Sequence, residues 1–218
     1  MWQFAADDLA LWDQCRRCFY LAVAADFPRP AEPDRLGAAP VRGQLLTGLR
    51  GTRTEKIADD MPAGLIDPGP HAVRSAPLAV QLPDSVYRCA IRGDVDALLT
   101  LDGATCGLAD IVVGAPGEAA LAAHARRLHA CAHAVETPAS GERKNVRALG
   151  VLAFEPDDAG AAAGITGSWR WTPIPRDDGS FFGFLAEALS VLAQQAPPGG
   201  TALCRWCVYR DAGRRTGY

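Results

Sequence analysis

Lysine is nearly absent from this chain of 218 residues, whose 22 basic residues include only Lys56 and Lys144. The remaining 20 are arginines, a bias typical of a GC-rich genome. Any reaction that needs a lysine ammonium group must therefore use one of these two residues. The net charge of −3 and the isoelectric point near 5.8 give no overall attraction to nucleic acid, but they do not exclude a local basic groove.

The sequence also lacks long apolar runs, since no segment approaches the roughly 18 residues that a membrane-spanning helix needs. Residues 1–15, MWQFAADDLALWDQC, hold acidic residues where a signal peptide has a basic start and an apolar stretch. We therefore expect a cytoplasmic protein without membrane association. In that compartment the seven cysteines are expected to be reduced thiols or metal ligands, not a disulfide framework.

Hydrophobic residues make up 49% of the chain, enough for one substantial core, so we expect a single domain over residues 1–218. The spacing of apolar residues predicts helices at about 5–24, from within 27–43 toward 58, at 118–136 and at 177–195. It predicts strands at 76–82, 86–100, 105–113, 146–156 and 167–174, with irregular chain at 61–73. This order predicts an α/β fold with a mixed central β-sheet flanked by helices.

The segment LDGAT at 101–105 predicts a hairpin turn between two of these strands. A three-residue loop places Asp96 directly opposite Asp110, and a two-residue loop misses that pairing by one residue. Asp94 and Asp96 share one face of their strand, and Asp110 and Val112 share one face of the next. Two carboxylates on the same face are hard oxygen ligands suited to Mg²⁺ or Mn²⁺.

Three motifs together resemble the PD-(D/E)XK nuclease superfamily, in the RecB-type branch that includes the iron–sulfur exonucleases of CRISPR adaptation. They are GDVD at 93–96, GLADIVV at 107–113 and the helical segment LHACAHAVE at 128–136. Gly93 and Asp96 match the first motif of that family, and Asp110 matches the acid of the second. The resemblance implies a restriction-endonuclease-like core that acts on DNA ends or single strands in repair, recombination or mobile-element biology.

The resemblance also implies a ligand set for catalytic metal. Asp96, Asp110 and the carbonyl of Ile111 are expected to hold one or two Mg²⁺ or Mn²⁺ ions for phosphodiester hydrolysis. Glu55 lies where the family sometimes presents an additional acid from an early helix, which makes it a candidate third side-chain ligand.

Three positions depart from the family pattern. Val112 stands where the motif has its lysine, Arg127 stands about where the helix has its glutamine, and Cys131 replaces a tyrosine. Valine cannot orient a water molecule or stabilise developing negative charge, so the rate is expected to fall by orders of magnitude. Arg126 or Arg127 could supply the missing positive charge, and Arg127 is the stronger catalytic candidate by position. Two hypotheses therefore stand: a metal-dependent DNA nuclease that is catalytically impaired, and a non-catalytic DNA- or protein-binding scaffold with the same fold.

Two C-x2-C pairs lie at opposite ends of the chain, CRRC at 15–18 and CRWC at 204–207. Four thiolates of this kind suit a structural zinc ion or a [4Fe–4S] cluster. The expected ligands are Cys15, Cys18, Cys204 and Cys207. In the resembling nucleases such cysteines join the chain ends around an iron–sulfur cluster, usually with one ligand from the first end and three from the second. This chain offers two and two, so zinc and the cluster both remain candidates.

Overall fold

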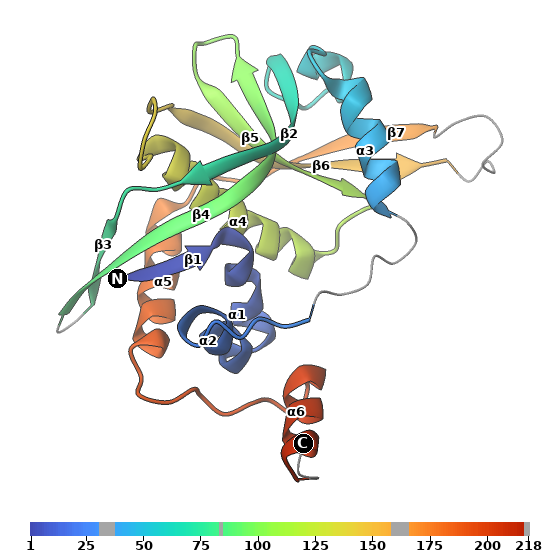
Figure 1. Cartoon of the computed structure of the whole chain (residues 1–218). Helices are drawn as coiled ribbons and strands as arrows, with labels where there is room; N and C mark the ends of the chain where they lie inside the picture. Colours follow the sequence, from blue (N-terminus) through green and yellow to red (C-terminus); the bar gives the residue numbers. More distant parts are fainter. Residues whose placement is uncertain (31–37, 83–84, 158–165, 216–218) are drawn as a thin grey trace.

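The computed structural model describes residues 1–30, 38–82, 85–157 and 166–215, and its centre is a seven-stranded mixed sheet (Figure 1). The strands are β1 Trp2–Ala5, β2 Gly64–Arg74, β3 Leu78–Leu82, β4 Ser85–Leu101, β5 Cys106–Val113, β6 Val146–Pro156 and β7 Gly167–Pro173. The α-helices are α1 Leu11–Gln14, α2 Arg16–Ala24, α3 Ala38–Leu49, α4 Glu118–Glu136, α5 Asp178–Leu192 and α6 Arg205–Arg215, with short 3-10 turns η1 Ala6–Ala10 and η2 Thr54–Lys56. The expected mixed sheet flanked by helices is confirmed. Within the described ranges, no helix is both long and apolar enough to cross a membrane.

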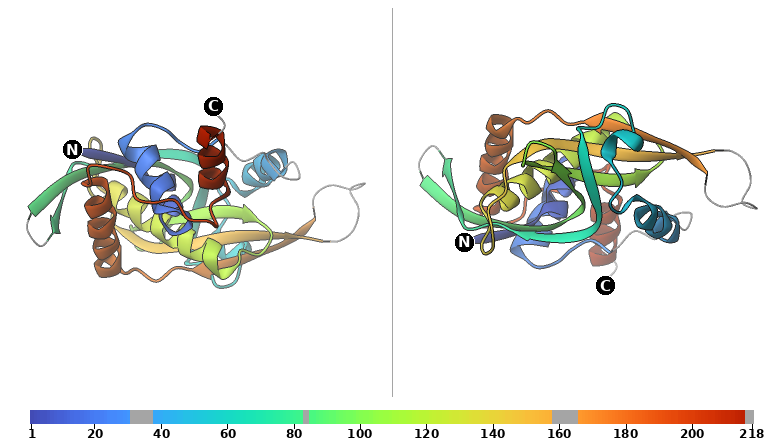
Figure 2. Two further views of the ribbon diagram at one scale, coloured as in Figure 1. Left: turned by 90° about the horizontal axis from the view of Figure 1, so that it is seen from below. Right: turned by 90° about the horizontal axis from the view of Figure 1, so that it is seen from above.

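Helices cover both faces of the sheet because successive side chains of the inner strands point to opposite sides. Leu108 of β5 and Val151 of β6 belong to the larger core, which packs against α2, α4 and α5. Their neighbours Ala109 and Leu152 belong to a second core, with Leu49 of α3. Figure 2 shows α4 and α5 on one side of the strands and α3 on the other. This two-sided burial explains why β5 and β6 are almost continuously apolar.

Strand β4 is the longest element of the sheet and pairs with four other strands. Strands β2 and β3 pair with it on one edge, and β1 and β5 share the other edge. On that shared edge, β1 pairs in parallel as far as Arg92, and β5 pairs antiparallel from Ala97 onward. Residues 93–96 of β4 therefore lie at a fork between β1 and β5, where a side chain can replace ladder hydrogen bonds.

The hairpin between β4 and β5 has the three-residue loop. Ala97 lies opposite Ala109 and Thr100 opposite Cys106, the register that places Asp96 and Asp110 level with each other. The Leu101 N–H donates to the Thr105 carbonyl at 2.9 Å and closes the loop. Ala104 takes the left-handed conformation (φ 56°) that the third residue of such a loop adopts.

The predicted elements from residue 76 onward are confirmed to within a few residues, whereas the first 75 residues need corrections. The expected helix at 5–24 is split into β1, η1, α1 and α2, because Cys15 is extended (φ −171°) and interrupts it. The helix predicted to run toward 58 ends at Leu49, where Gly51 (φ 71°) takes the left-handed conformation that terminates helices.

The prediction of irregular chain at 61–73 is wrong, since this segment forms most of β2. Its Pro68-Gly69-Pro70 sequence indicates a break, and a break is present, but only as a shift of pairing register between Pro68 and His71. Prolines are tolerated at such an irregularity, where ladder hydrogen bonds are already lost. Helix α6 was likewise not predicted, because its polar sequence has no clear apolar stripe.

Candidate functional site: a carboxylate fork and a four-cysteine cluster

The first candidate site lies at the fork beside β4. Beyond the Ala97–Ala109 pair, the Ile111 N–H does not join a ladder with β4 but donates to Asp96 Oδ2 at 2.9 Å. The Asp96 side chain therefore takes the place of a backbone acceptor and fixes the separation of the two strands. The structure thus brings Asp96, Asp110 and the backbone N–H of Ile111 together, whereas the resemblance assigned the Ile111 carbonyl to a metal ion.

Asp110 is the most enclosed acid of this site, with a side chain that is 0% exposed. Helix α4 supplies its partners: His124 Nδ1 donates to Asp110 Oδ2 at 2.7 Å, and Arg127 Nη1 pairs with Asp110 Oδ1. These two residues lie three positions apart, so they face the same side of α4. A buried carboxylate needs such partners, because an uncompensated charge costs several kcal/mol.

Arg127 occupies the centre of the fork. Its Nε donates to Asp7 Oδ1 at 2.6 Å, its Nη2 donates to the Asp94 carbonyl at 2.5 Å, and Nη2 also lies 3.9 Å from Asp96 Oδ1. Burial alone would lower the pKa of this guanidinium, but the charges of Asp110, Asp7 and Asp96 together raise it above its ordinary value. The group is a permanent cation surrounded by carboxylates.

Arg42 of α3 supplies a second cation and pairs with Asp96 Oδ1. All four carboxylate oxygens of Asp96 and Asp110 consequently have a donor: a backbone N–H, a histidine ring and two guanidiniums. A divalent ion needs the same oxygens as ligands. The residues in this arrangement therefore do not fit Mg²⁺ or Mn²⁺, because Arg42 and Arg127 already supply the positive charge.

The remaining predicted residues lie in different places. Glu55 accepts from Arg53 Nε at 2.7 Å, and Arg53 also binds Asp102 in the hairpin turn at 2.7 and 2.8 Å. Asp96 lies six residues before Asp102 in the chain, a distance of about 20 Å in an extended strand. The structure therefore does not bring Glu55 to the pair, and Glu55 is not a third ligand there. Arg126 points elsewhere, pairing with Asp13 and stacking on Phe184.

Val112 follows Asp110 on the same face of β5 and is partly buried against the larger core. Neither lysine takes its place. Lys56 lies in η2 beside Glu55, and Lys144 lies near Cys106 at the far end of β5.

The fork opens to solvent through a depression of about 400 Å³. Its lining residues include Asp96, Arg42, His124 and Arg127.

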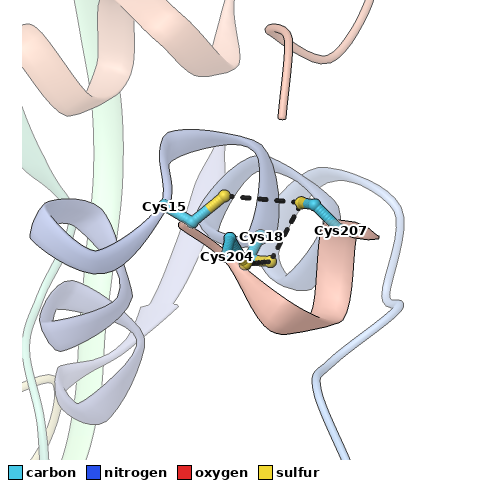
Figure 3. Close-up of side chains that lie close together, drawn as sticks. All are labelled: Cys15, Cys18, Cys204 and Cys207. Carbon is cyan, nitrogen blue, oxygen red and sulfur yellow. Dashed lines mark hydrogen bonds between the residues drawn. The ribbon is translucent and has the colours of Figure 1, made fainter. Parts of the chain in front are cut away.

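The second candidate site joins the two ends of the chain. The Sγ atoms of its four cysteines all lie within 4.8 Å of one another, and all four residues are buried. Figure 3 shows the sulfurs converging from the start of α2 and the start of α6. The predicted ligand set, Cys15, Cys18, Cys204 and Cys207, is confirmed as one cluster that could hold zinc or an iron–sulfur centre. Among the described residues, it is the one group of three or more metal-capable side chains.

The two C-x2-C pairs are built alike. Cys15 directly precedes α2 and its carbonyl accepts from Phe19 N–H at 3.1 Å, while Cys204 directly precedes α6 and its carbonyl accepts from Val208 N–H at 3.0 Å. Each pair therefore lies at a helix N-terminus, where free N–H groups and the helix dipole favour negative charge.

Hydrogen bonds within the cluster make its thiols unequal. Burial raises the pKa of Cys204, but the Cys207 N–H and the thiols of Cys18, Cys15 and Cys207 outweigh it and lower that pKa to about 6. Burial raises the pKa of Cys18 and Cys207, and the hydrogen bonds that these thiols make with neighbouring cluster sulfurs act in the same direction, with Arg29 opposing at Cys18. Arg29 Nη2 donates to Cys204 Sγ at 3.4 Å. A metal ion bound here would displace the protons that remain on these thiols, because it binds cysteine as the thiolate.

Sequence reasoning did not assign Asp7, Arg42 or His124 to the fork. His124 carries a weak signal, because it stands three residues before Arg127 on the helix that the sequence predicts at 118–136. Asp7 and Arg42 carry none, since each reaches the site only through the tertiary placement of η1 or α3.

No model of a known protein family matches the chain, and no curated protein matches it. Solved structures do match, among them one described as "Crystal structure of SSO0001". The two chains are 12% identical with a TM-score of 0.43, over 89% of this chain and 78% of the other. That likeness is distant. The class of protein is therefore defined by the strand order and the two clusters themselves: a mixed α/β fold whose ends meet at a four-cysteine site.

Proposed function

We propose that this protein is a nuclease-like domain of the PD-(D/E)XK type that binds DNA without cleaving it. The observation that carries the proposal is the position of Arg127, whose guanidinium lies among the carboxylates of Asp7, Asp96 and Asp110. In a metal-dependent nuclease these carboxylates hold the ion that polarises the phosphate and activates water. An arginine can balance their charge, but it has no coordination site for water.

The residue beyond the second acid supports the same conclusion. Val112 shares the face of Asp110, so it stands where an activating ammonium group would point at the attacking water. Its side chain offers neither a proton donor nor a charge. With Arg127 among the carboxylates and valine at position 112, the proposed domain would lack both a metal-activated water and an ammonium group beside it.

DNA as the partner is supported by the position of basic groups at the open side of the fork. Arg42 is 40% exposed and lies with His124 and Arg127 around the same depression. Basic residues that retain free donors at a groove contact phosphates without reading sequence. A protein partner is the competing outcome, and a binding test separates the two.

Cleavage is tested on labelled single- and double-stranded DNA with Mg²⁺ or Mn²⁺. We expect no product from the wild type, and none from Asp96→Ala/Asp110→Ala. The combination Val112→Lys/Arg42→Gln/Arg127→Gln restores both missing parts and is the variant expected to gain activity, while Val113→Lys/Arg42→Gln/Arg127→Gln places the same charge on the opposite face as a matched control. Cleavage by the wild type that is lost in the double alanine variant would refute the proposal.

Binding is tested by fluorescence anisotropy with the same oligonucleotides over a range of salt concentrations. We expect an affinity that falls as salt rises, because contacts to phosphates release counterions. Arg42→Gln is expected to weaken binding, and Arg170→Gln, which removes a surface arginine paired with Glu155 on β6, serves as the control. Absence of binding to either form of DNA would favour the protein-binding scaffold.

A further inference from the structure

We propose that the four-cysteine cluster holds a single tetrahedral zinc ion and not an iron–sulfur cluster. The inference rests on the separation of the sulfur atoms and on the packing behind them. It is independent of the function proposed for the fork.

The sulfur separations match one ion. Cys15 Sγ lies 3.5 Å from Cys207 Sγ, and Cys18 Sγ lies 3.6 Å from Cys204 Sγ and 3.8 Å from Cys207 Sγ (Figure 3). Four thiolates bound to one zinc at about 2.3 Å lie about 3.8 Å from one another at the corners of a tetrahedron. A [4Fe–4S] cluster inserts four irons and four sulfides between the same thiolates, so it needs them much further apart.

The cysteine of the second pair that lies within α6 has close neighbours on the chain. A Cβ added at Gly200 would lie 2.9 Å from Cys207 Cβ and 3.1 Å from Cys207 Sγ, so the backbone there already contacts Cys207. Trp206 packs against the cluster from the same helix turn. An outward shift of Cys207 to make room for a larger cluster would therefore require its neighbours to shift as well.

Charge around the cluster also suits the ion. A zinc ion with four thiolates has a net charge of −2, which burial makes costly unless cations lie nearby. Arg29 donates to Cys204 Sγ at 3.4 Å. Arg17 lies near Cys207, because a Cβ added at Gly200 would lie 3.1 Å from both Arg17 Nη1 and Cys207 Sγ. Arg17 Nη1 is also paired with Asp211 at 3.1 Å. Such outer partners hold metal ligands in place and commonly affect metal affinity by about 10–100-fold.

The first test is the metal content of the full chain, expressed with both iron and zinc in the medium and purified without oxygen so that a labile cluster would survive. We expect one zinc per chain, no acid-labile sulfide and no visible charge-transfer absorption of an iron–sulfur cluster. Four irons with four sulfides would overturn the proposal, as would one iron without sulfide or a chain free of metal.

A variant tests the role of Arg29 without removing a ligand. Arg29→Gln deletes the N–H···S bond and one positive charge, and we expect zinc affinity in a chelator competition to fall about 10-fold. Arg16→Gln, beside Cys15 in sequence but stacked on Trp12, is the matched control and should leave the affinity unchanged. Equal affinities for wild type and Arg29→Gln would overturn the assignment of Arg29. Cobalt substitution gives a second readout, since tetrahedral thiolate coordination is visible in its absorption spectrum.

Discussion

The carboxylate fork and the four-cysteine cluster differ in what already satisfies their donor atoms. At the fork, every oxygen of Asp96 and Asp110 accepts a hydrogen bond or an ion pair, and two of the donors are arginines. In the cluster, the sulfurs mainly contact one another, with Arg29 as the added donor. The comparison teaches that carboxylates can be fully paired with cations and donors of the same chain, while a group of cysteines in that chain keeps its sulfurs available to an ion.

The two regions also differ in what they hold together. The fork lies within the sheet and its partners come from β4, β5, α4, η1 and α3. Helix α6 lies apart from the sheet (Figure 1), and the cysteines, the Arg17–Asp211 ion pair and the stacking of Arg210 on Phe27 tie it to the body. Loss of the cluster should therefore release α6 first and leave the fork intact.

The largest effect is expected from Cys204→Ser. The variant should lose the metal, whose binding contributes on the order of 10 kcal/mol in structural zinc sites. Hydrogen exchange should then show α6 amides exchanging like those of an unfolded segment, while β4 and β5 stay protected. Cys89→Ala is the control, because Cys89 is buried but lies outside the cluster and should cost only about 1 kcal/mol. Unchanged protection of α6 in Cys204→Ser would contradict the claim that the cluster holds α6 to the rest of the protein.

Arg127→Gln should have the next largest effect. It leaves the buried Asp110 without its main counter-charge, so we expect a loss of about 3–5 kcal/mol in the free energy of unfolding, measured with urea on the metal-loaded protein. Asp110→Asn/Arg127→Gln removes both charges and should recover most of that loss. If the single variant costs less than about 1 kcal/mol, Arg127 is an ordinary surface ion pair and not a substitute cation.

His124→Ala sharpens the account of the fork. Asp110 Oδ2 loses its donor while Arg127 remains, so we expect a cost of about 1–2 kcal/mol in the same urea experiment. His71→Ala on β2 is the matched control, because that ring binds the Asp67 carbonyl at an exposed position. Equal effects in the two variants would mean that the enclosure of Asp110 adds nothing to its hydrogen bond.

The smallest effect is a pH dependence that belongs to neither region. Burial lowers the pKa of His133 below its ordinary 6.5, with Arg176 acting in the same direction and Glu136 and Asp178 opposing. The folded state thus favours the neutral ring, so stability is greatest above pH 6.5 and decreases as pH falls through the lowered pKa. Urea unfolding of wild type and His133→Gln at several pH values checks this. The stability of the wild type relative to the variant should increase as pH rises toward 6.5, and a relative stability that instead increases as pH falls would have the wrong sign.

Local sequence predicted the parts of the fork that depend on a short loop. The turn at 101–105 restricted the register of β4 and β5 to two choices, and one of them placed Asp96 beside Asp110. Arg127 was named from the resemblance, because it stands about where the family's helix carries a glutamine. The four cysteines were found because both pairs have the spacing of metal ligands.

The parts that were missed depend on contacts distant in sequence. Arg42 and Asp7 look like solvated charges until α3 and η1 are placed on the two sides of the fork. Strand β2 was hidden because Pro68 and Pro70 read as breakers, although they fall at a register shift that tolerates them. Glu55 was assigned to the metal by its position in the chain, yet Arg53 holds it at the hairpin turn.

The most direct test of the central claim is the binding of Mn²⁺ to the zinc-loaded protein, followed by electron paramagnetic resonance. The account predicts that Mn²⁺ stays free with the wild type, because Arg42 and Arg127 already pair with the carboxylates of Asp96 and Asp110 that would bind it. It predicts that Arg42→Gln/Arg127→Gln binds one Mn²⁺ and that a further Asp110→Asn change abolishes this. Binding of Mn²⁺ by the wild type that disappears in Asp96→Asn/Asp110→Asn would contradict the account.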